Sequence, residues 1–288
     1  MKNPRKTTQA QESAPTLKHS HTLMALVLIV VAAVAAYSNT FNVPFIFDDS
    51  QAITENRNIR QIFPLTTSMD GPPMTTVAAR PFICLTIAIN HAISKADVWS
   101  YHVLNLIVHI LASLALFGIV RRTLQRPKLR EEFGPAATAI ALISALIFAV
   151  HPLQTESVTY TIQRCESVMG LCFLSTLYFA ILGWDMPAWR IPFHVLAALC
   201  CAAGMMSKEV MVVAPLLVLL YDYMLNAPPD ADRAAKGQHS SFWKERRIPN
   251  SIWLYAGLVI TWAILIKLMA SGKSQSASKI NGTLNVFE

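Results

Sequence analysis

Long apolar runs alternate with shorter polar segments along most of this 288-residue chain. Seven of these runs, taken with their flanking residues, are long enough and low enough in charge for a helix to cross the hydrocarbon core of a bilayer. Such spans must be helical, because an open strand in lipid would leave backbone N–H and C=O groups without partners. The pattern therefore predicts an all-α polytopic bundle of about seven transmembrane helices. The expected spans are residues 23–37, 101–120, 135–150, 166–184, 192–206, 210–225 and 252–269.

The segments between the spans define the expected organisation. Residues 1–21 read as a disordered basic tail, residues 22–270 as one transmembrane module, and residues 271–288 as a polar tail. Within the module, residues 41–100 form an unusually long first loop, and loops of that length tend to be functional. Short helices on the membrane surface are expected in it, including an apolar stretch at residues 81–93.

The composition supports a membrane protein. Apolar residues make up 53% of the chain and charged residues only 14%, compared with roughly 25% charged in a soluble domain. The net charge is +7 and the pI is about 9.3. The basic residues are nevertheless not gathered in a patch with aromatic residues between them, so no nucleic acid is expected. The basic residues read instead as topology signals facing anionic membrane lipids. The five cysteines have no zinc-site spacing and are expected to be buried free thiols.

The distribution of basic residues also predicts the orientation. Five of the ten residues at positions 121–130 are lysine or arginine, which places this loop in the cytoplasm. Alternating the spans from there puts the amino terminus inside, the loop 41–100 outside and the carboxyl terminus outside. A multi-pass integral membrane protein follows, and the absence of a retrieval signal and the compact loops favour a bacterial inner membrane over the endoplasmic reticulum.

Two adjacent acids, Asp48 and Asp49, stand just beyond the first span, on the predicted outer side. They are candidate catalytic residues. The alternative is that they only mark a helix end and a turn. Other ionisable side chains fall on the same side, where such groups line a cavity or pair with each other. The further candidates, for substrate binding, are Arg80, His102, Glu156, Arg164, Lys208 and Glu209.

Local spacing sharpens three of these candidates. His102, Asn105 and His109 share one helical face, although a hydrogen-bonded seam between helices explains His109 better. Glu156 and Arg164 fit an i, i+4 ladder through Tyr160, which can brace the fold as readily as bind substrate.

The turn that contains Lys208 and Glu209 is either an ordinary short loop or a phosphate contact, since a lysine offers a point charge suited to phosphate. A carboxylate can take the proton of an acceptor hydroxyl while Lys or Arg neutralises a departing phosphate. The same residues can serve a proton-coupled transporter, but the acids lie at a helix exit and no interrupted spans occur in matching halves.

The order of these motifs resembles a known family. Phe47-Asp48-Asp49, Arg80-Pro81, Tyr101-His102, His151-Pro152 with Glu156 and Arg164, and Ser207-Lys208-Glu209 together resemble the transmembrane and tetratricopeptide-repeat proteins. These are O-mannosyltransferase-like membrane glycosyltransferases of the C fold.

The resemblance implies transfer of a sugar, often mannose, from a polyprenyl-phosphate carrier to a hydroxyl of a protein or glycan, without a metal or other cofactor. It implies Asp48 as the base with Asp49 in support, and candidate phosphate contacts at Arg164 and Lys208. Family members usually read Gly-Arg-Asp where this chain has Gln163-Arg164-Cys165-Glu166, and they continue into tetratricopeptide repeats. A non-catalytic scaffold or a truncated relative is therefore the alternative to an enzyme.

Overall fold

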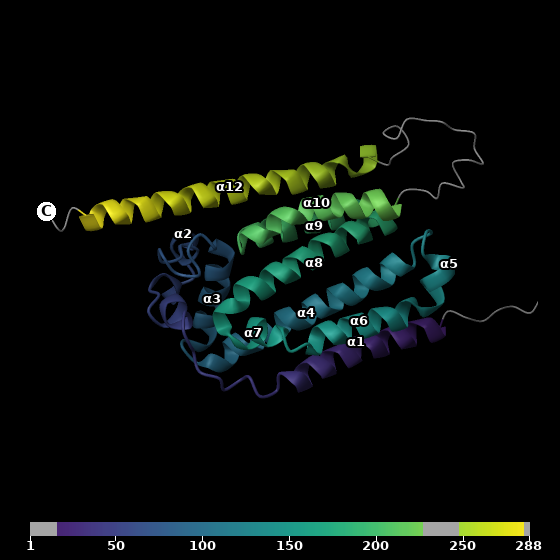
Figure 1. Cartoon of the computed structure of the whole chain (residues 1–288), viewed down its shortest axis with the longest axis horizontal. Helices are drawn as coiled ribbons and strands as arrows, with labels where there is room; N and C mark the ends of the chain where they lie inside the picture. The colour runs from purple at the N-terminus through teal and green to yellow at the C-terminus, as the bar shows by residue number, and fades with distance from the viewer. Residues whose placement is uncertain (1–15, 227–247, 285–288) are drawn as a thin grey trace, which may run out of the picture.

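The computed structural model describes residues 16–226 and 248–284, and its described elements are all helical (Figure 1). Long helices lie side by side, and the short elements of the first loop gather at one end of the bundle, opposite α5. This confirms the all-α helical bundle that the sequence predicts. The longer elements are α1 (Thr16–Ala36), α3 (Pro81–Ser94), α4 (Val98–Leu124), α6 (Ala137–Val150), α8 (Arg164–Asp185), α9 (Arg190–Met205), α10 (Ala214–Tyr221) and α12 (Ile248–Leu284). The shorter ones are η1 (Ser50–Thr54), η2 (Asn58–Arg60), α2 (Leu65–Ser68), α5 (Arg130–Phe133), η3 (Gly134–Ala136), α7 (Gln154–Thr159), η4 (Thr161–Gln163), η5 (Pro187–Trp189), η6 (Glu209–Val213) and η7 (Asp222–Asn226).

Six helical segments within the described residues are long and apolar enough to cross a membrane. The first predicted span corresponds to α1, whose apolar part, Ser20–Ala36, is slightly shorter than the other six. Because α1 begins at Thr16, residues 16–21 belong to this helix and not to the predicted disordered tail, while residues 1–15 lie outside the described part. Part of the predicted polar tail, residues 271–284, continues α12 as helix.

Alanine lets α6 approach two neighbouring helices, α1 and α4, closely. Ala137, Ala141, Ala145 and Ala149 recur every four residues on α6 and are fully buried, and α6 packs against both α1 and α4. Small side chains at such a seam allow close backbone contact, which is how helices associate where lipid removes the hydrophobic driving force. The outer faces of α6 and α12 instead expose large apolar side chains, including Ile147 and Ile260. That distribution is the one a lipid-facing bundle requires.

Basic residues at the α5 end of the bundle are held by Asp185, which terminates α8. Its carboxylate pairs with Arg122 and Arg126, with N···O distances of 2.8 Å in both cases. The loop 121–130 and the turn after α8 therefore lie together, as the predicted topology requires of two segments on one side of a membrane. No local pattern in the sequence indicates Asp185 as their partner.

The first loop folds back on the bundle. One face of α3 is buried, at Ile83, Cys84, Ile87 and Ala88, and the helix packs against η2, α2 and α4. The expectation that this apolar stretch lies on the bilayer is thus wrong for its buried face, because the loop itself and the end of α4 cover it.

Candidate active site at the loop end of the bundle

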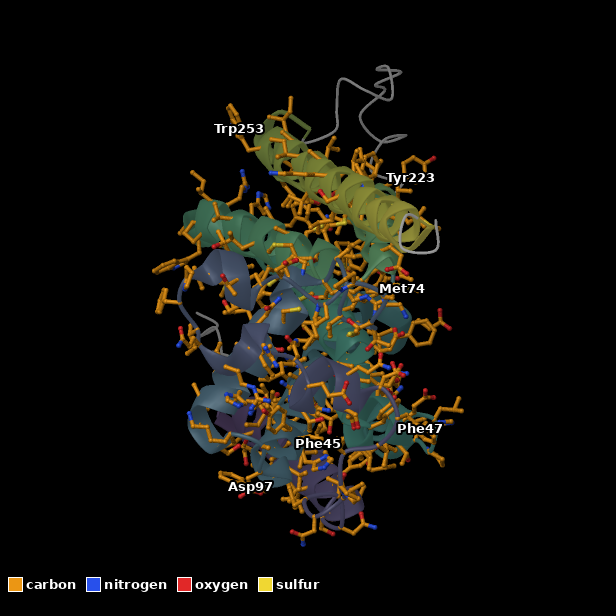
Figure 2. The ribbon with its side chains drawn as sticks, turned by 90° about the vertical axis from the view of Figure 1, so that its left-hand side faces the viewer. Phe45, Phe47, Met74, Asp97, Tyr223 and Trp253 are labelled. Carbon is orange, nitrogen blue, oxygen red and sulfur yellow. The ribbon has the colours of Figure 1, made fainter. Side chains whose placement is uncertain are left out.

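The acidic motif sits in the first loop just before η1, at the end of the bundle that Figure 2 faces. Asp49 is buried, with 1% of its surface exposed. Its two carboxylate oxygens accept hydrogen bonds from the backbone N–H groups of Ile46, at 3.0 Å, and of Ile162, at 2.8 Å. The second bond joins the loop to η4, directly before α8. Asp49 therefore fixes the loop to the bundle.

Asp48 lies beside it in the opposite environment. Its side chain is exposed, and within the described residues its carboxylate has no hydrogen bond or ion pair. Only its backbone is held, since the Asp48 N–H donates to the Tyr160 hydroxyl at 3.0 Å. The structure thus separates the two acids into a buried one that holds the loop and an exposed one that is open to a ligand.

The residue before the pair has a strained backbone. Phe47 has φ of 47°, a left-handed conformation that is uncommon for a bulky residue and is often found at functional sites. Its ring is 83% exposed and meets Tyr160 edge-on, with the centroids 6.2 Å apart. Figure 2 labels Phe47 and Phe45 on this end of the molecule, and Phe45 packs edge-on against Tyr101. The turn therefore holds an exposed aromatic ring next to the exposed acid.

Burial raises the pKa of Asp49, and the neighbouring charge of Asp48 raises it further. The two backbone hydrogen bonds and the positive charge of Arg164 act in the other direction but do not cancel the effect of burial. A carboxyl group with a raised pKa beside an exposed carboxylate is a feature that catalytic sites share with structural ion-pair networks.

Arg164, a predicted phosphate contact, is fully buried beneath this loop. Its guanidinium donates to the side-chain oxygens of Asn105, at 2.7 Å, and Asn90, at 2.6 Å. Two further N–H groups reach the backbone carbonyls of Tyr101, at 3.0 Å, and Thr86, at 3.4 Å. Because a guanidinium has five N–H donors, only one is left for another partner. This geometry makes Arg164 the central link between α3, α4 and α8.

The predicted i, i+4 ladder from Glu156 to Arg164 is wrong. The chain leaves the helix at Tyr160, which is extended with φ of −77° and ψ of 112°, so α7 and α8 are separate helices. Glu156 is exposed and accepts a hydrogen bond from the Gln163 side chain at 3.1 Å, while Arg164 turns into the core. The helix break at Tyr160 could not be predicted, because no glycine or proline stands near it in the sequence.

The inward-facing stripe on α4 is as predicted, with His102, Asn105 and His109 all buried. His102 Nε2 donates to the Val43 carbonyl at 2.9 Å, and His109 Nε2 donates to the Ala149 carbonyl at 2.9 Å. His102, a predicted substrate contact, therefore holds the start of the first loop from within. His109 forms the seam between helices that the sequence analysis favoured for it.

The cationic candidates lie at the turn between α9 and η6. Arg80 pairs with Glu209 at 3.7 Å, and Lys208 forms an ion pair with Glu166; all four side chains are partly exposed. The start of α3 reaches the same turn, because the Phe82 N–H donates to the Met206 carbonyl at 3.2 Å. Arg80, Lys208 and Glu209 were predicted from the sequence, but their pairing was not.

One short segment, residues 162–166, brings together four of the eight predicted site residues: Asp49, Glu156, Arg164 and Lys208. Ile162 binds Asp49, Gln163 binds Glu156, Arg164 crosses the core, and Glu166 binds Lys208. The Ile162 backbone was not predicted, since a main-chain donor leaves no signal in the sequence, and neither was Asn90, whose partner Arg164 lies 74 positions away. The described residues contain no group of three or more His, Cys, Asp or Glu side chains that could hold a metal ion, and independence from a metal stays a prediction.

Comparison with known proteins identifies relatives of this chain. Residues 75–237 match the family model described as dolichyl-phosphate-mannose-protein mannosyltransferase. The mouse protein O-mannosyl-transferase TMTC3 is 32% identical over 156 residues, which cover 51% of this chain and 16% of that protein. Tmtc3 of Drosophila melanogaster is 27% identical over 184 residues, covering 58% and 20%, and tmtc2 of Xenopus laevis is 25% identical over 257 residues, covering 85% and 28%.

This chain thus spans less than a third of the length of these curated relatives. No solved structure matches it. The family match covers more than half of the chain, including α3, α4, the segment 162–166 and the turn at Lys208. The chain therefore belongs to the dolichyl-phosphate-mannose-protein mannosyltransferase family.

Proposed function

We propose that this chain carries the glycosyltransferase site of a membrane enzyme that moves a sugar from a polyprenyl-phosphate carrier to a hydroxyl group of a protein or glycan. The family description and the names of the relatives support mannose as the sugar and a protein as the acceptor. The observation that carries the proposal is the exposure of Asp48 next to an Asp49 that is buried and hydrogen-bonded on both oxygens.

In the proposed reaction, the Asp48 carboxylate takes the proton of the acceptor hydroxyl as that oxygen bonds to the anomeric carbon of the sugar. The bond from the anomeric carbon to the carrier phosphate breaks, and the polyprenyl phosphate leaves with the bonding electrons. A carboxylate in this role typically contributes about 10²–10⁴-fold to the rate. Asp49 serves by holding the loop.

Lys208 and Arg80 are the proposed phosphate partners in this mechanism. Both are partly exposed and close to their acidic partners Glu166 and Glu209, so an arriving phosphate can compete for them. Arg164 is a less suitable phosphate ligand than the sequence suggested, because four of its N–H groups are already bonded. Glu156, exposed on α7, is the proposed contact for the acceptor, and His102 positions the loop.

We further propose that this end of the bundle faces the extracytoplasmic side and that the amino terminus is cytoplasmic. The basic loop 121–130 at the other end supports this orientation. That the protein lies in a bacterial inner membrane stays a prediction.

The test is transfer of radiolabelled mannose or glucose from the corresponding polyprenyl phosphates in membranes that contain the protein. Wild type should incorporate label into protein or glycan, and Asp48→Asn should lose at least about a hundredfold of that rate. Asp70→Asn is the matched control, because Asp70 is an exposed acid of the same loop outside the proposed site. Unchanged transfer by Asp48→Asn would reject Asp48 as the base. No transfer by folded wild type would favour a non-catalytic scaffold.

A further inference from the structure

A large cleft is lined by residues around α5. Figure 1 shows α5 at the end of the bundle opposite the first loop, which carries Asp48. Its volume is about 1110 Å³ and its walls come from α1, the end of α4, α5 with η3, and the start of α6. Small-molecule sites in proteins usually occupy roughly 300–1,000 Å³, so the cleft is large enough for a lipid head group and the first part of its acyl chains. Neither the family match nor the proposed reaction accounts for it.

The cleft has two chemically different parts. Arg121 and Arg130 line it with His21 and Gln125, whereas Met24, Ala25 and Leu142 line it with apolar surface. The apolar wall is continuous with the buried contact among α1, α4 and α6 that Ala25 and Leu142 help to form. A cationic rim above an apolar wall matches an amphiphile whose negative group lies at the membrane surface.

The two arginines differ from the other basic residues of their loop. Arg122 and Arg126 share an ion pair with the single carboxylate of Asp185, and the Lys128 ammonium donates to the Met224 carbonyl at 2.9 Å. Arg121 uses its Nε to donate to the Thr138 hydroxyl at 3.1 Å, which orients its guanidinium in the cleft. In the described part of the chain, neither Arg121 nor Arg130 forms an ion pair. The acids next to Arg130, Glu131 and Glu132, are not among the residues that line the cleft.

We propose that this cleft binds one anionic glycerophospholipid of the leaflet on the α5 side, with its phosphate between Arg121 and Arg130 and its chains along Met24 and Leu142. A guanidinium is well suited to phosphate because it offers parallel N–H donors. Anionic lipids are attracted to basic residues next to a span. The site is independent of the proposed transferase reaction and lies at the other end of the bundle.

The experiment is native mass spectrometry of the full protein released from nanodiscs that contain phosphatidylglycerol or phosphatidylcholine with identical chains. Wild type should retain one phosphatidylglycerol in preference to phosphatidylcholine. Arg121→Gln combined with Arg130→Gln should reduce that preference by about tenfold or more. The matched control is Lys128→Gln, which removes the same charge from the same loop outside the cleft lining and should keep the wild-type preference.

A second variant keeps the proposal testable if the arginine pair also affects folding. Ala139→Leu places bulk on the exposed lining of the cleft without changing charge, and it should displace the retained lipid as well. Equal retention by both cleft variants and wild type would overturn the proposal. An equal loss of lipid preference in Lys128→Gln would show that the lipid is attracted by the charge of the loop alone. Displacement of the lipid by inorganic phosphate, without any effect of acyl-chain length, would show a site for free phosphate. Either result would overturn the proposal.

Discussion

The carboxylate of Asp49 accepts a hydrogen bond from the backbone N–H of Ile162, 113 positions further along the chain, at 2.8 Å. This bond joins the first loop to the segment that begins α8, and it leaves the neighbouring Asp48 as the exposed acid. One carboxylate therefore supports the local fold while the other is available for chemistry.

Replacement of Asp49 by asparagine should destabilise the protein, because an amide can offer only one acceptor oxygen to the two N–H groups. The expected loss is about 1.5–3 kcal/mol of unfolding free energy, as for hydrogen bonds to a charged group. Unfolding in mixed detergent micelles measures it. Asp48→Asn is the internal control and should change stability by less than about 0.5 kcal/mol; equal losses in both variants would contradict the division between the two acids.

Tyr160→Phe removes the hydroxyl that accepts from the Asp48 backbone. The proposed base would then be less well positioned, and kcat for sugar transfer should fall about fivefold to thirtyfold, equivalent to roughly 1–2 kcal/mol. KM should change little, because the hydroxyl is not a proposed substrate contact. Tyr178→Phe, in the middle of α8, should leave kcat unaltered. A change confined to KM in Tyr160→Phe would instead indicate direct contact with substrate.

Arg164→Lys should be strongly destabilising despite the conserved charge. A lysine ammonium cannot reach Asn90, Asn105 and the Tyr101 carbonyl at once, and the unpaired buried acceptors cost on the order of 3 kcal/mol. Thermal unfolding of the detergent-solubilised protein provides the measurement. Arg57→Lys, on an exposed part of the first loop, is the control. Wild-type stability in Arg164→Lys would show that the guanidinium network is not a structural link.

Two glycines of α8 should respond in opposite directions to alanine. A Cβ at Gly183 would overlap the His194 ring of α9, whereas a Cβ at Gly170 would meet no atom within 4 Å. Overpacking costs about 1–3 kcal/mol, while alanine is favoured over glycine inside a helix by up to about 1 kcal/mol. Gly183→Ala should therefore lower the unfolding temperature and Gly170→Ala should keep or raise it. The same sign for both would count against the α8–α9 contact.

The first loop should loosen in mild acid through His91. Its Nε2 accepts from Arg60 at 3.2 Å, and burial, then the charges of Arg60 and Lys95, lower the pKa of His91. The unfolded chain therefore binds a proton at higher pH than the folded chain. Neutral His91 therefore contributes fully to the stability of the folded loop above about pH 6.5, the pKa of histidine in an unfolded chain. This contribution is lost as the pH falls through the lower pKa that His91 has in the folded protein.

Hydrogen exchange of residues 54–60 and 81–94 between about pH 7.5 and pH 5 tests this, after correction for the intrinsic exchange rate. Protection should decrease toward acid in wild type. His91→Gln keeps an acceptor for Arg60 but has no titrating ring, so its protection should be flat over this range. A parallel decrease in both proteins would assign the effect to another group.

The sequence by itself determined the helical class and most of the helix positions. Apolar runs must become helices in lipid, because no other spanning structure satisfies the backbone, and the observed α8 (Arg164–Asp185) and α9 (Arg190–Met205) begin within two residues of the predicted spans. The inward stripe of His102, Asn105 and His109 was equally readable, since helical periodicity fixes which residues share a face.

The tertiary structure alone decided the environment of each side chain in the candidate site. Local spacing does not tell Asp48 from Asp49, whereas the hydrogen bonds that Asp49 accepts from the Ile46 and Ile162 N–H groups distinguish the two acids. Likewise, Arg164 was predicted to contact phosphate, whereas in the structure its guanidinium donates to the side chains of Asn90 and Asn105. The physical reason is the same in both cases: burial and long-range hydrogen bonds depend on segments brought together from far along the chain, and local periodicity carries no record of them.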